Sequence, residues 1–192
     1  MTTRVKARVI AISVLVVAMG QLRPTGQPSP EFLLAPGRAG RLEVGMSADD
    51  VYRLVGRERT RLIDLHREGM FEPALEVRLA AAASQPAIVM LVREWPCIAW
   101  SVQALEVRDR RFRTAEGIGV GSTLAEVSQA YTVRVSNEEG PHARVESLQM
   151  GFRLDDASFA PTAKVTSIWL PGNPVAIRQA RCPERGALGQ ER

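Results

Sequence analysis

The sequence predicts an α+β fold of two tandem repeats, each a helix plus an antiparallel hairpin, sharing one sheet with both helices packed on one face. A pattern of glycine turn and helix start at 117–131 has a weaker copy at 42–56. Alternating apolar residues follow each copy, as expected for half-buried strands. The two halves correspond at an offset of 75 or 76 residues, which indicates an internal repeat.

Each copy carries the same signals for the start of a helix. Gly45 and Gly121 stand where a strand must turn into a helix, and glycine adopts backbone angles that other residues avoid. Ser47 and Thr123 follow them as predicted N-caps. Glu126, three residues after Thr123, is placed to complete a capping box.

The first copy has a weaker version of the same box. Asp50 holds the position of the glutamate, and its shorter side chain fits a capping box less well, although its charge suits the first turn. We expect helices near 47–56 and 123–131. Val51 and Val127 begin an apolar stripe on one face of each helix.

The strands are predicted from apolar alternation and from short apolar runs. The offset between the halves aligns 75–79 with 150–154, both of which alternate apolar and polar residues. The predicted strands cover residues 59–65, 75–79, 88–92 and 97–107 in the first half, and 132–135, 148–154 and 165–170 in the second.

Residues 1–20 have the order of a secretory signal peptide. Three basic residues precede an apolar core at 9–19, and Ala18 and Gly20 are small residues suited to cleavage after Gly20. The apolar core is about half of the ~20 residues that a membrane-spanning helix needs. Retention of this segment as an N-terminal anchor is the alternative.

The rest of the chain divides by composition. Residues 21–40 contain four prolines and are expected to be a flexible linker. Residues 41–183 are expected to form a single α+β domain with repeats at about 41–107 and 113–183. The polar residues 184–192 are expected to be a mobile tail.

The charge of the chain argues against a nucleic-acid partner. The formal net charge is +4, but the first twenty residues hold Arg4, Lys6 and Arg8 and no acidic residue, so it falls to +1 without them. Basic and acidic residues are interspersed in the remainder. This pattern favours a solvated mixed surface over a phosphate-binding face.

No catalytic, cofactor or metal site is predicted. His66 and His142 each lie near a glycine and acidic residues in predicted turns, where exposed histidines are common. The glycine run at 117–121 lacks the spacing of a dinucleotide or P-loop fingerprint. The carboxylate pairs at 49–50 and 155–156 are adjacent in sequence, so they point different ways and suit caps and turns.

The tryptophans are the best candidates for a recognition face. Trp95, Trp100 and Trp169 lie in or beside predicted strands, where burial in the core is the alternative for each of them. The two cysteines of the chain, Cys97 and Cys182, are predicted to form a disulfide, because a signal segment implies an oxidising compartment. Two unrelated thiols are the other interpretation.

The motif Val-Gly-Met-Ser-x-x-Asp-Val-x-x-Leu-Val-Gly at 44–56 resembles a unit of two bacterial secreted families. These are the small outer-membrane assembly lipoproteins of the SmpA/OmlA type and the β-lactamase inhibitory proteins, which carry two tandem copies. The resemblance covers about a dozen residues in each copy, and it implies a helix against an antiparallel sheet in an extracytoplasmic setting. The lipoproteins' anchoring cysteine is absent, and no inhibitor contact residue is matched.

The sequence therefore predicts a non-catalytic binding or interaction protein, periplasmic or secreted, whose partner is a protein or another envelope component. It predicts no nucleic-acid partner and no stable membrane span after signal cleavage. A small extracytoplasmic hydrolase and a structural envelope protein anchored by its N-terminus are the alternatives.

Overall fold

A computed structural model describes residues 28–67, 69–78, 86, 88–94 and 100–172, and within them strands prevail over helices. In chain order the elements are η1 (Pro30–Phe32), β1 (Leu34–Ala35), β2 (Arg38–Ala39), β3 (Leu42–Glu43), α1 (Ala48–Val55), η2 (Arg57–Arg59), β4 (Thr60–Arg67), β5 (Met70–Val77), β6 (Ile88–Glu94), β7 (Trp100–Val107), α2 (Leu124–Ala130), β8 (Arg134–Ser136), β9 (His142–Val145), η3 (Glu146–Leu148), β10 (Met150–Leu154) and β11 (Val165–Pro171).

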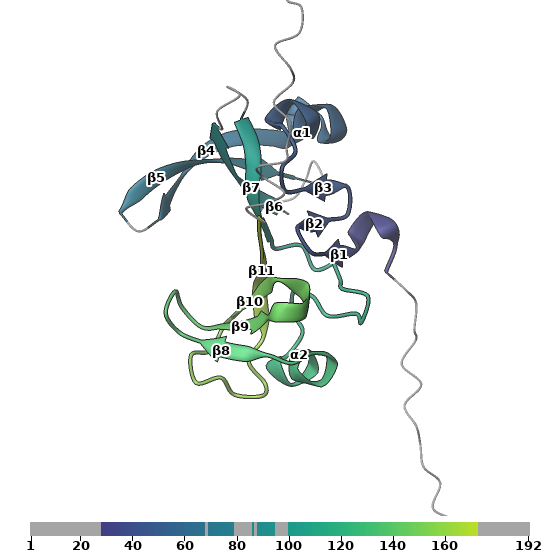
Figure 1. The fold of residues 1–192 in the computed structure, drawn as a ribbon, viewed down its shortest axis with the longest axis vertical. Helices are drawn as coiled ribbons and strands as arrows, with labels where there is room; N and C mark the ends of the chain where they lie inside the picture. The colour runs from purple at the N-terminus through teal and green to yellow at the C-terminus, as the bar shows by residue number, and fades with distance from the viewer. Residues whose placement is uncertain (1–27, 68, 79–85, 87, 95–99, 173–192) are drawn as a thin grey trace, which may run out of the picture.

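A large antiparallel sheet runs through the whole molecule (Figure 1). Its strand order is β4-β5-β6-β7-β11-β10-β9-β8, so the two halves meet where β7 pairs with β11. In each half a helix precedes four strands that are paired in sequence order. β4 and β8, the first strands of the two halves, therefore lie at the two edges of the sheet.

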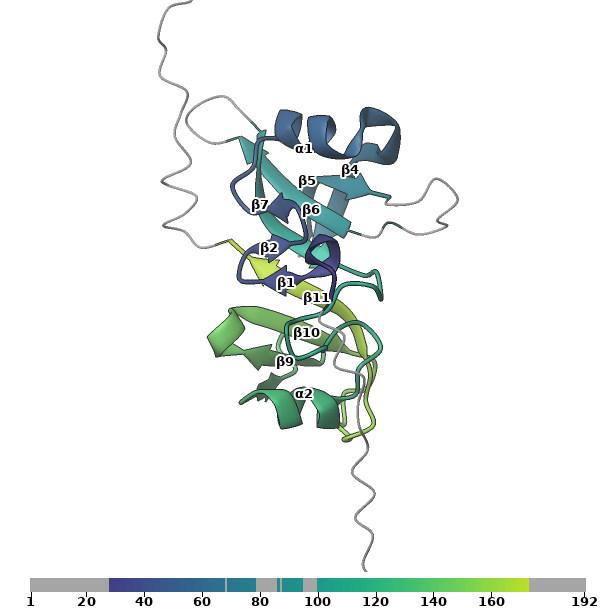
Figure 2. The ribbon, with the colours of Figure 1, turned by 90° about the vertical axis from the view of Figure 1, so that its right-hand side faces the viewer.

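The predicted fold class is wrong, because the described part of the protein is mostly β. Four strands rather than one hairpin follow each helix, and the helices have only 8 and 7 residues. They are not packed together on one face of a shared sheet. α1 lies at one end of the molecule and α2 at the other, with the small sheet β1-β2-β3 between them (Figures 1 and 2).

The physical reasons for this error are local. Gly56, at a φ of 96°, ends α1 after two turns, and extended backbone at Tyr131 ends α2. β9 was missing from the predicted strands, because its four residues directly follow a turn rich in glycine, proline and acidic residues. The amphipathic stripe of a helix identifies the face that it buries, but not the element that covers that face.

The predicted helix caps are confirmed. The Ser47 hydroxyl oxygen accepts a hydrogen bond from the Asp50 backbone N–H at 3.0 Å. At α2 the capping box is complete: the Thr123 hydroxyl accepts from the Glu126 N–H at 3.3 Å, and the Glu126 carboxylate accepts from the Thr123 N–H at 2.9 Å. Each bond pairs a backbone group that the first helical turn leaves without an intrahelical partner.

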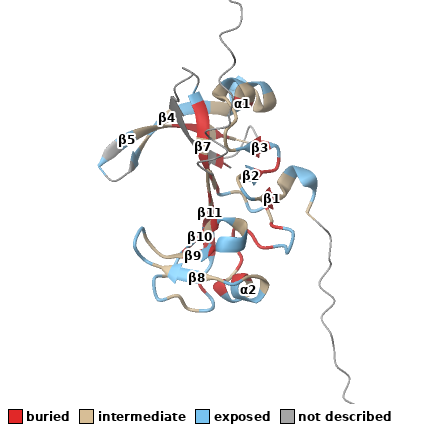
Figure 3. Ribbon diagram, in the orientation of Figure 1, coloured by how far each residue is buried: buried red, intermediate tan, exposed pale blue. Residues whose placement is uncertain are grey.

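The core lies between the large sheet, the helices and the small sheet, and buried residues concentrate along the central strands (Figure 3). Phe112 and Phe152 are among the largest buried side chains. Part of the expected linker also contributes, because Leu34 and Ala39 are buried in β1 and β2. The ring of Phe32 meets that of Phe112 edge-on at 5.3 Å, which helps to hold this segment on the core.

None of the helices in the described ranges has the length and apolar character needed to cross a membrane. The predicted signal segment 1–20 and the tail 184–192 lie outside the described residues, so both remain predictions.

Candidate functional site

Side chains of the large sheet alternate between the core and a second face, which we call the outer face. One row of paired residues crosses all eight strands, and its members in β5, β7, β11, β10 and β9 each stand between two core residues of their own strand. From β4 to β8 its side chains belong to Arg61, Glu76, Glu106, Trp169, Arg144 and Arg134, with Gly151 between Trp169 and Arg144. In β6 the backbone of Val89 pairs with both Glu76 and Glu106 and so continues the row. The row places charged groups at both ends of the face and an aromatic side chain near its middle.

An apolar cluster occupies the middle of the outer face. Trp169 is half-buried and, with Ile63, packs against Ala74 and Ala104. Gly151 is the strand partner of Trp169, and a β-carbon added there would lie 3.7 Å from Trp169 Cβ. Gly151 therefore has room for a β-carbon at ordinary van der Waals contact with Trp169.

The charges on the β4–β7 half of the outer face are matched by opposite charges. Arg61 Nε lies 3.2 Å from Glu76 Oε2, and Arg108 donates to both carboxylate oxygens of Glu106 at 3.1 and 3.0 Å. Burial opposes ionisation of Glu106, but the hydrogen bond and charge of Arg108, helped by Ser167, outweigh it and lower its pKa. This half of the face is therefore close to electrical neutrality.

The β8–β10 part of the outer face carries three exposed arginines that the sequence analysis did not single out, namely Arg134, Arg144 and Arg153, which we call the arginine patch. Arg144 Nε lies 3.0 Å from Glu146 Oε1. Within the described residues, no carboxylate lies at ion-pair distance from the other two. Alternation along β9 would have placed Arg144 on this face, but that strand was not predicted.

The two histidines are far apart. His66 is in β4 and His142 in β9, six strands away, which is roughly 29 Å at the usual strand spacing. The His66 ring contacts the Phe71 ring with centroids 5.1 Å apart. His142 Nδ1 lies 3.0 Å from the Gly140 carbonyl oxygen. In the ranges that the structure describes, no group of three potential ligands could hold a metal ion.

The three tryptophans do not form one described cluster. Trp95 lies outside the described residues, as do Cys97 and Cys182, so the disulfide remains a prediction. Trp100 begins β7 and is 38% exposed. Trp169 pairs with Glu106, six residues further along the same strand, so the backbones of the two tryptophans lie roughly 20 Å apart along the strand direction.

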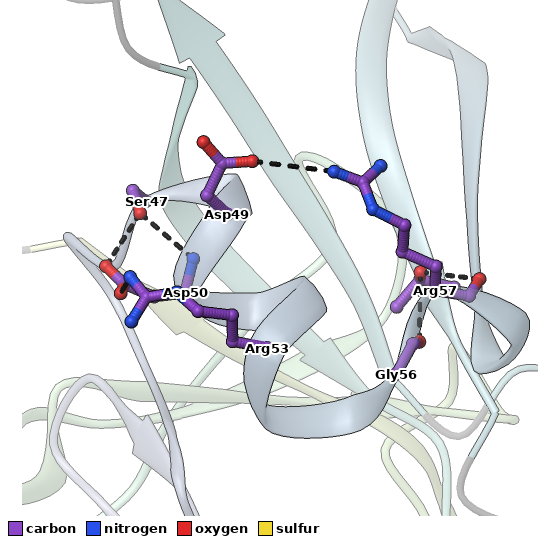
Figure 4. Close-up of polar contacts among 7 residues, drawn as sticks. Ser47, Asp49, Asp50, Arg53, Gly56 and Arg57 are labelled. Atoms are coloured by element: carbon purple, nitrogen blue, oxygen red, sulfur yellow. Dashed lines mark hydrogen bonds and ion pairs between the residues drawn. The ribbon is translucent and has the colours of Figure 1, made fainter.

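A hollow of about 410 Å³ lies beside α1, and its charged side chains pair with one another (Figure 4). Asp49, Tyr52, Arg53 and Arg57 line it. Arg57 Nη2 lies 3.9 Å from Asp49 Oδ1, and its guanidinium lies 4.4 Å from the centre of the Tyr52 ring. Arg53 pairs with Asp50, so both guanidinium groups already have partners.

Asp49 and Asp50 lie in the first turn of α1 and serve different partners, as their adjacency predicted. Asp50 hydrogen-bonds the Ser47 hydroxyl at 2.6 Å, and this bond, helped by the charge of Arg53, lowers the pKa of Asp50. This chemistry is that of a helix cap and not that of a pair sharing a proton.

Tyr131 fixes the segment that leads into α2. Its hydroxyl donates to the Glu116 carboxylate and lies 2.7 Å from Thr114 Oγ1. Burial of the phenol, together with the hydrogen bond to Glu116, raises the pKa of Tyr131 to about 12. The phenol is therefore protonated at neutral pH, and its contacts are those of a structural clamp.

Comparison with known proteins identifies the fold alone. No family model matches the sequence, and no curated protein matches it. The uncharacterized protein yfeY from Escherichia coli has a similar structure, with a TM-score of 0.52 and 13% sequence identity. The similarity covers 72% of this chain and 96% of that one, so nearly the whole fold of yfeY is represented here.

Proposed function

We propose that this chain is a non-catalytic binding protein of the periplasm or the extracellular medium, and that the outer face of its large sheet contacts the partner. The observation that carries the proposal is the row of residues from Arg61 to Arg134, which crosses the whole sheet with Trp169 near its centre. The signal-like order of residues 1–20 supports the location.

The composition of the outer face supports a protein partner. Interfaces between proteins are enriched in tryptophan and arginine, and they typically combine an apolar centre with a polar rim. Trp169, Ile63 and the alanines of β5 and β7 supply the apolar centre, and charged side chains surround it. The sequence resemblance to exported bacterial families agrees with this role.

Site-specific photo-crosslinking in the native envelope tests the proposal. A photoreactive residue replaces Ser136, the partner of His142 on the outer face, and in a control it replaces Ser128, which is exposed on α2. We expect a discrete protein adduct from position 136 and none from position 128. Equal adducts from both positions, or none from either, would contradict a binding role for the outer face.

A further inference from the structure

We propose that the arginine patch, Arg134, Arg144 and Arg153, docks a carboxylate-rich surface of a partner protein. This inference rests on the proposed function and names the chemistry of the partner. The patch occupies the part of the outer face that belongs to β8, β9 and β10, next to Gly151 and Trp169.

The register of the sheet forces like charges together in this patch. Arg134 and Arg144 are direct partners across β8 and β9. Cβ atoms of such partners lie about 5 Å apart, and two like charges placed there destabilise the sheet. Glu146 pairs with Arg144 from η3 and offsets part of this repulsion. Carboxylates of a partner would offset the remaining repulsion between the two arginines. Binding would therefore remove a destabilisation that is present in the free protein.

A backbone carbonyl holds Arg153 in place, and the charge of Arg153 also helps to lower the pKa of Glu106 on β7. Arg153 Nη2 donates to the Glu139 carbonyl oxygen at 2.9 Å, and its strand partner His142 bonds the carbonyl oxygen of Gly140. Both acceptors belong to the turn between β8 and β9. A carbonyl restricts the guanidinium but leaves its full charge, and such restriction in the free state lowers the entropy lost on binding.

The chemistry of the patch fits carboxylates of a protein better than a phosphate polymer. Polyanions bind through many phosphate contacts, with an affinity that grows with the number of cations. Here only three arginines face outward, one of them already paired with Glu146. The planar fork of arginine matches a carboxylate in two-point contact. Trp169, in the same row of the sheet, supplies the aromatic contact that protein interfaces favour.

The test measures binding of a short polyglutamate peptide to the full-length chain by calorimetry at low ionic strength. The probe variant is Arg134→Glu with Arg144→Glu, and the control is Arg53→Glu with Arg57→Glu, which reverses two exposed charges on α1 and η2. We expect the probe variant to weaken binding roughly tenfold or more, and the control to change it less than about twofold. Arg134→Gln with Arg144→Gln removes charge without reversing it and should give an intermediate loss.

Two other anions, both built on phosphate groups, test whether the patch prefers carboxylates. Inorganic polyphosphate and phosphatidylglycerol vesicles are measured against the same variants. Tighter binding of either anion than of polyglutamate, or equal losses in the probe and control variants, would overturn the inference. Circular dichroism of each variant shows whether the fold is intact. If the glutamate variant is unfolded, binding by the glutamine variant decides the test instead.

The two proposals fail in different ways. A discrete crosslink from position 136 combined with unchanged polyglutamate binding in the probe variant keeps the binding function and refutes the acidic partner. Arginine-dependent polyglutamate binding with no crosslink in the envelope supports the charge preference of the patch and refutes the binding function.

Discussion

Between α1 and β7 the outer-face arginine of the row stands opposite a carboxylate, whereas between α2 and β11 two arginines of the row stand opposite each other. Arg61 has Glu76 as its strand partner, and Arg134 has Arg144. Both pairs occupy the same row of one sheet. Since the first half places opposite charges side by side in this row, the sheet itself does not require two arginines as strand partners in the second half. The difference supports the proposal that the β8–β10 part of the face binds a partner.

The backbone that joins helix to sheet is nearly the same in the two halves. The Gly45 N–H donates to the Val102 carbonyl oxygen of β7 at 2.8 Å, and the Gly121 N–H donates to the Val165 carbonyl oxygen of β11 at 2.8 Å. Both glycines have φ near +90°, a region that other residues rarely adopt. The halves therefore share their internal construction and differ in the charges that they display.

The largest expected effect comes from the shared core. Val77 and Phe152 are fully buried and stand 75 residues apart. We expect Phe152→Ala to lower the free energy of unfolding by about 3–5 kcal/mol, and Val77→Ala by about 2 kcal/mol. Urea denaturation should show one transition for both variants, because β7 and β11 join the halves. Two separate transitions would mean that the halves unfold independently.

The predicted disulfide would tie the halves together at a second place. β11 runs antiparallel to β7, so the chain leaves Pro171 in the direction of Trp100. Eleven residues separate Pro171 from Cys182, and they can span roughly 36 Å, while four residues of β7 cover roughly 13 Å. Both cysteines lie outside the described residues, so the bond stays a prediction.

Reduction of that bond should lower the free energy of unfolding by roughly 4 kcal/mol in the chain-entropy model, or less where the bond is strained. Denaturation with and without reductant measures the loss, and Cys97→Ser with Cys182→Ser should reproduce it. Two free thiols titrated in the unreduced protein would be incompatible with the bridge.

Removal of the caps compares the two helix starts directly. Ser47→Ala and Thr123→Ala should each cost about 1 kcal/mol, and the loss at Thr123 should be the larger because it also breaks the capping box with Glu126. Ser128→Ala, at an exposed site on α2, is the control and should change stability by less than about 0.5 kcal/mol. An equal loss at Ser128 would remove the capping explanation.

The smallest expected effect is a pH dependence of the β4–β7 half. Glu106 has a lowered pKa in the folded protein, so it binds a proton more readily when unfolded. Its contribution to stability is therefore full above the unfolded pKa of 4.5 and is lost as the pH falls through the lower folded value. Glu106→Gln should flatten this part of the stability curve, while Glu146→Gln, an exposed residue, serves as the control.

Local features were predicted from the sequence, and long-range pairing was not. Ser47, Thr123 and Glu126 take the roles that their spacing indicated, because a cap needs only neighbours along the chain. The opposition of Arg134 and Arg144 depends on the register of two strands. Apolar alternation tells which residues share a face, but not which strand lies alongside or where it starts. The fold class was missed for the same reason.

The central place of the β7–β11 pair bears on how the protein is made. β7 is complete 58 residues before β11 begins, counting from Val107 to Val165. Until then, one side of β7 lacks its strand neighbour, and an open edge with an apolar face pairs readily with other chains. During synthesis the first half is thus exposed to strand exchange and aggregation until β11 pairs with β7 and covers this edge, which lies in the middle of the finished sheet.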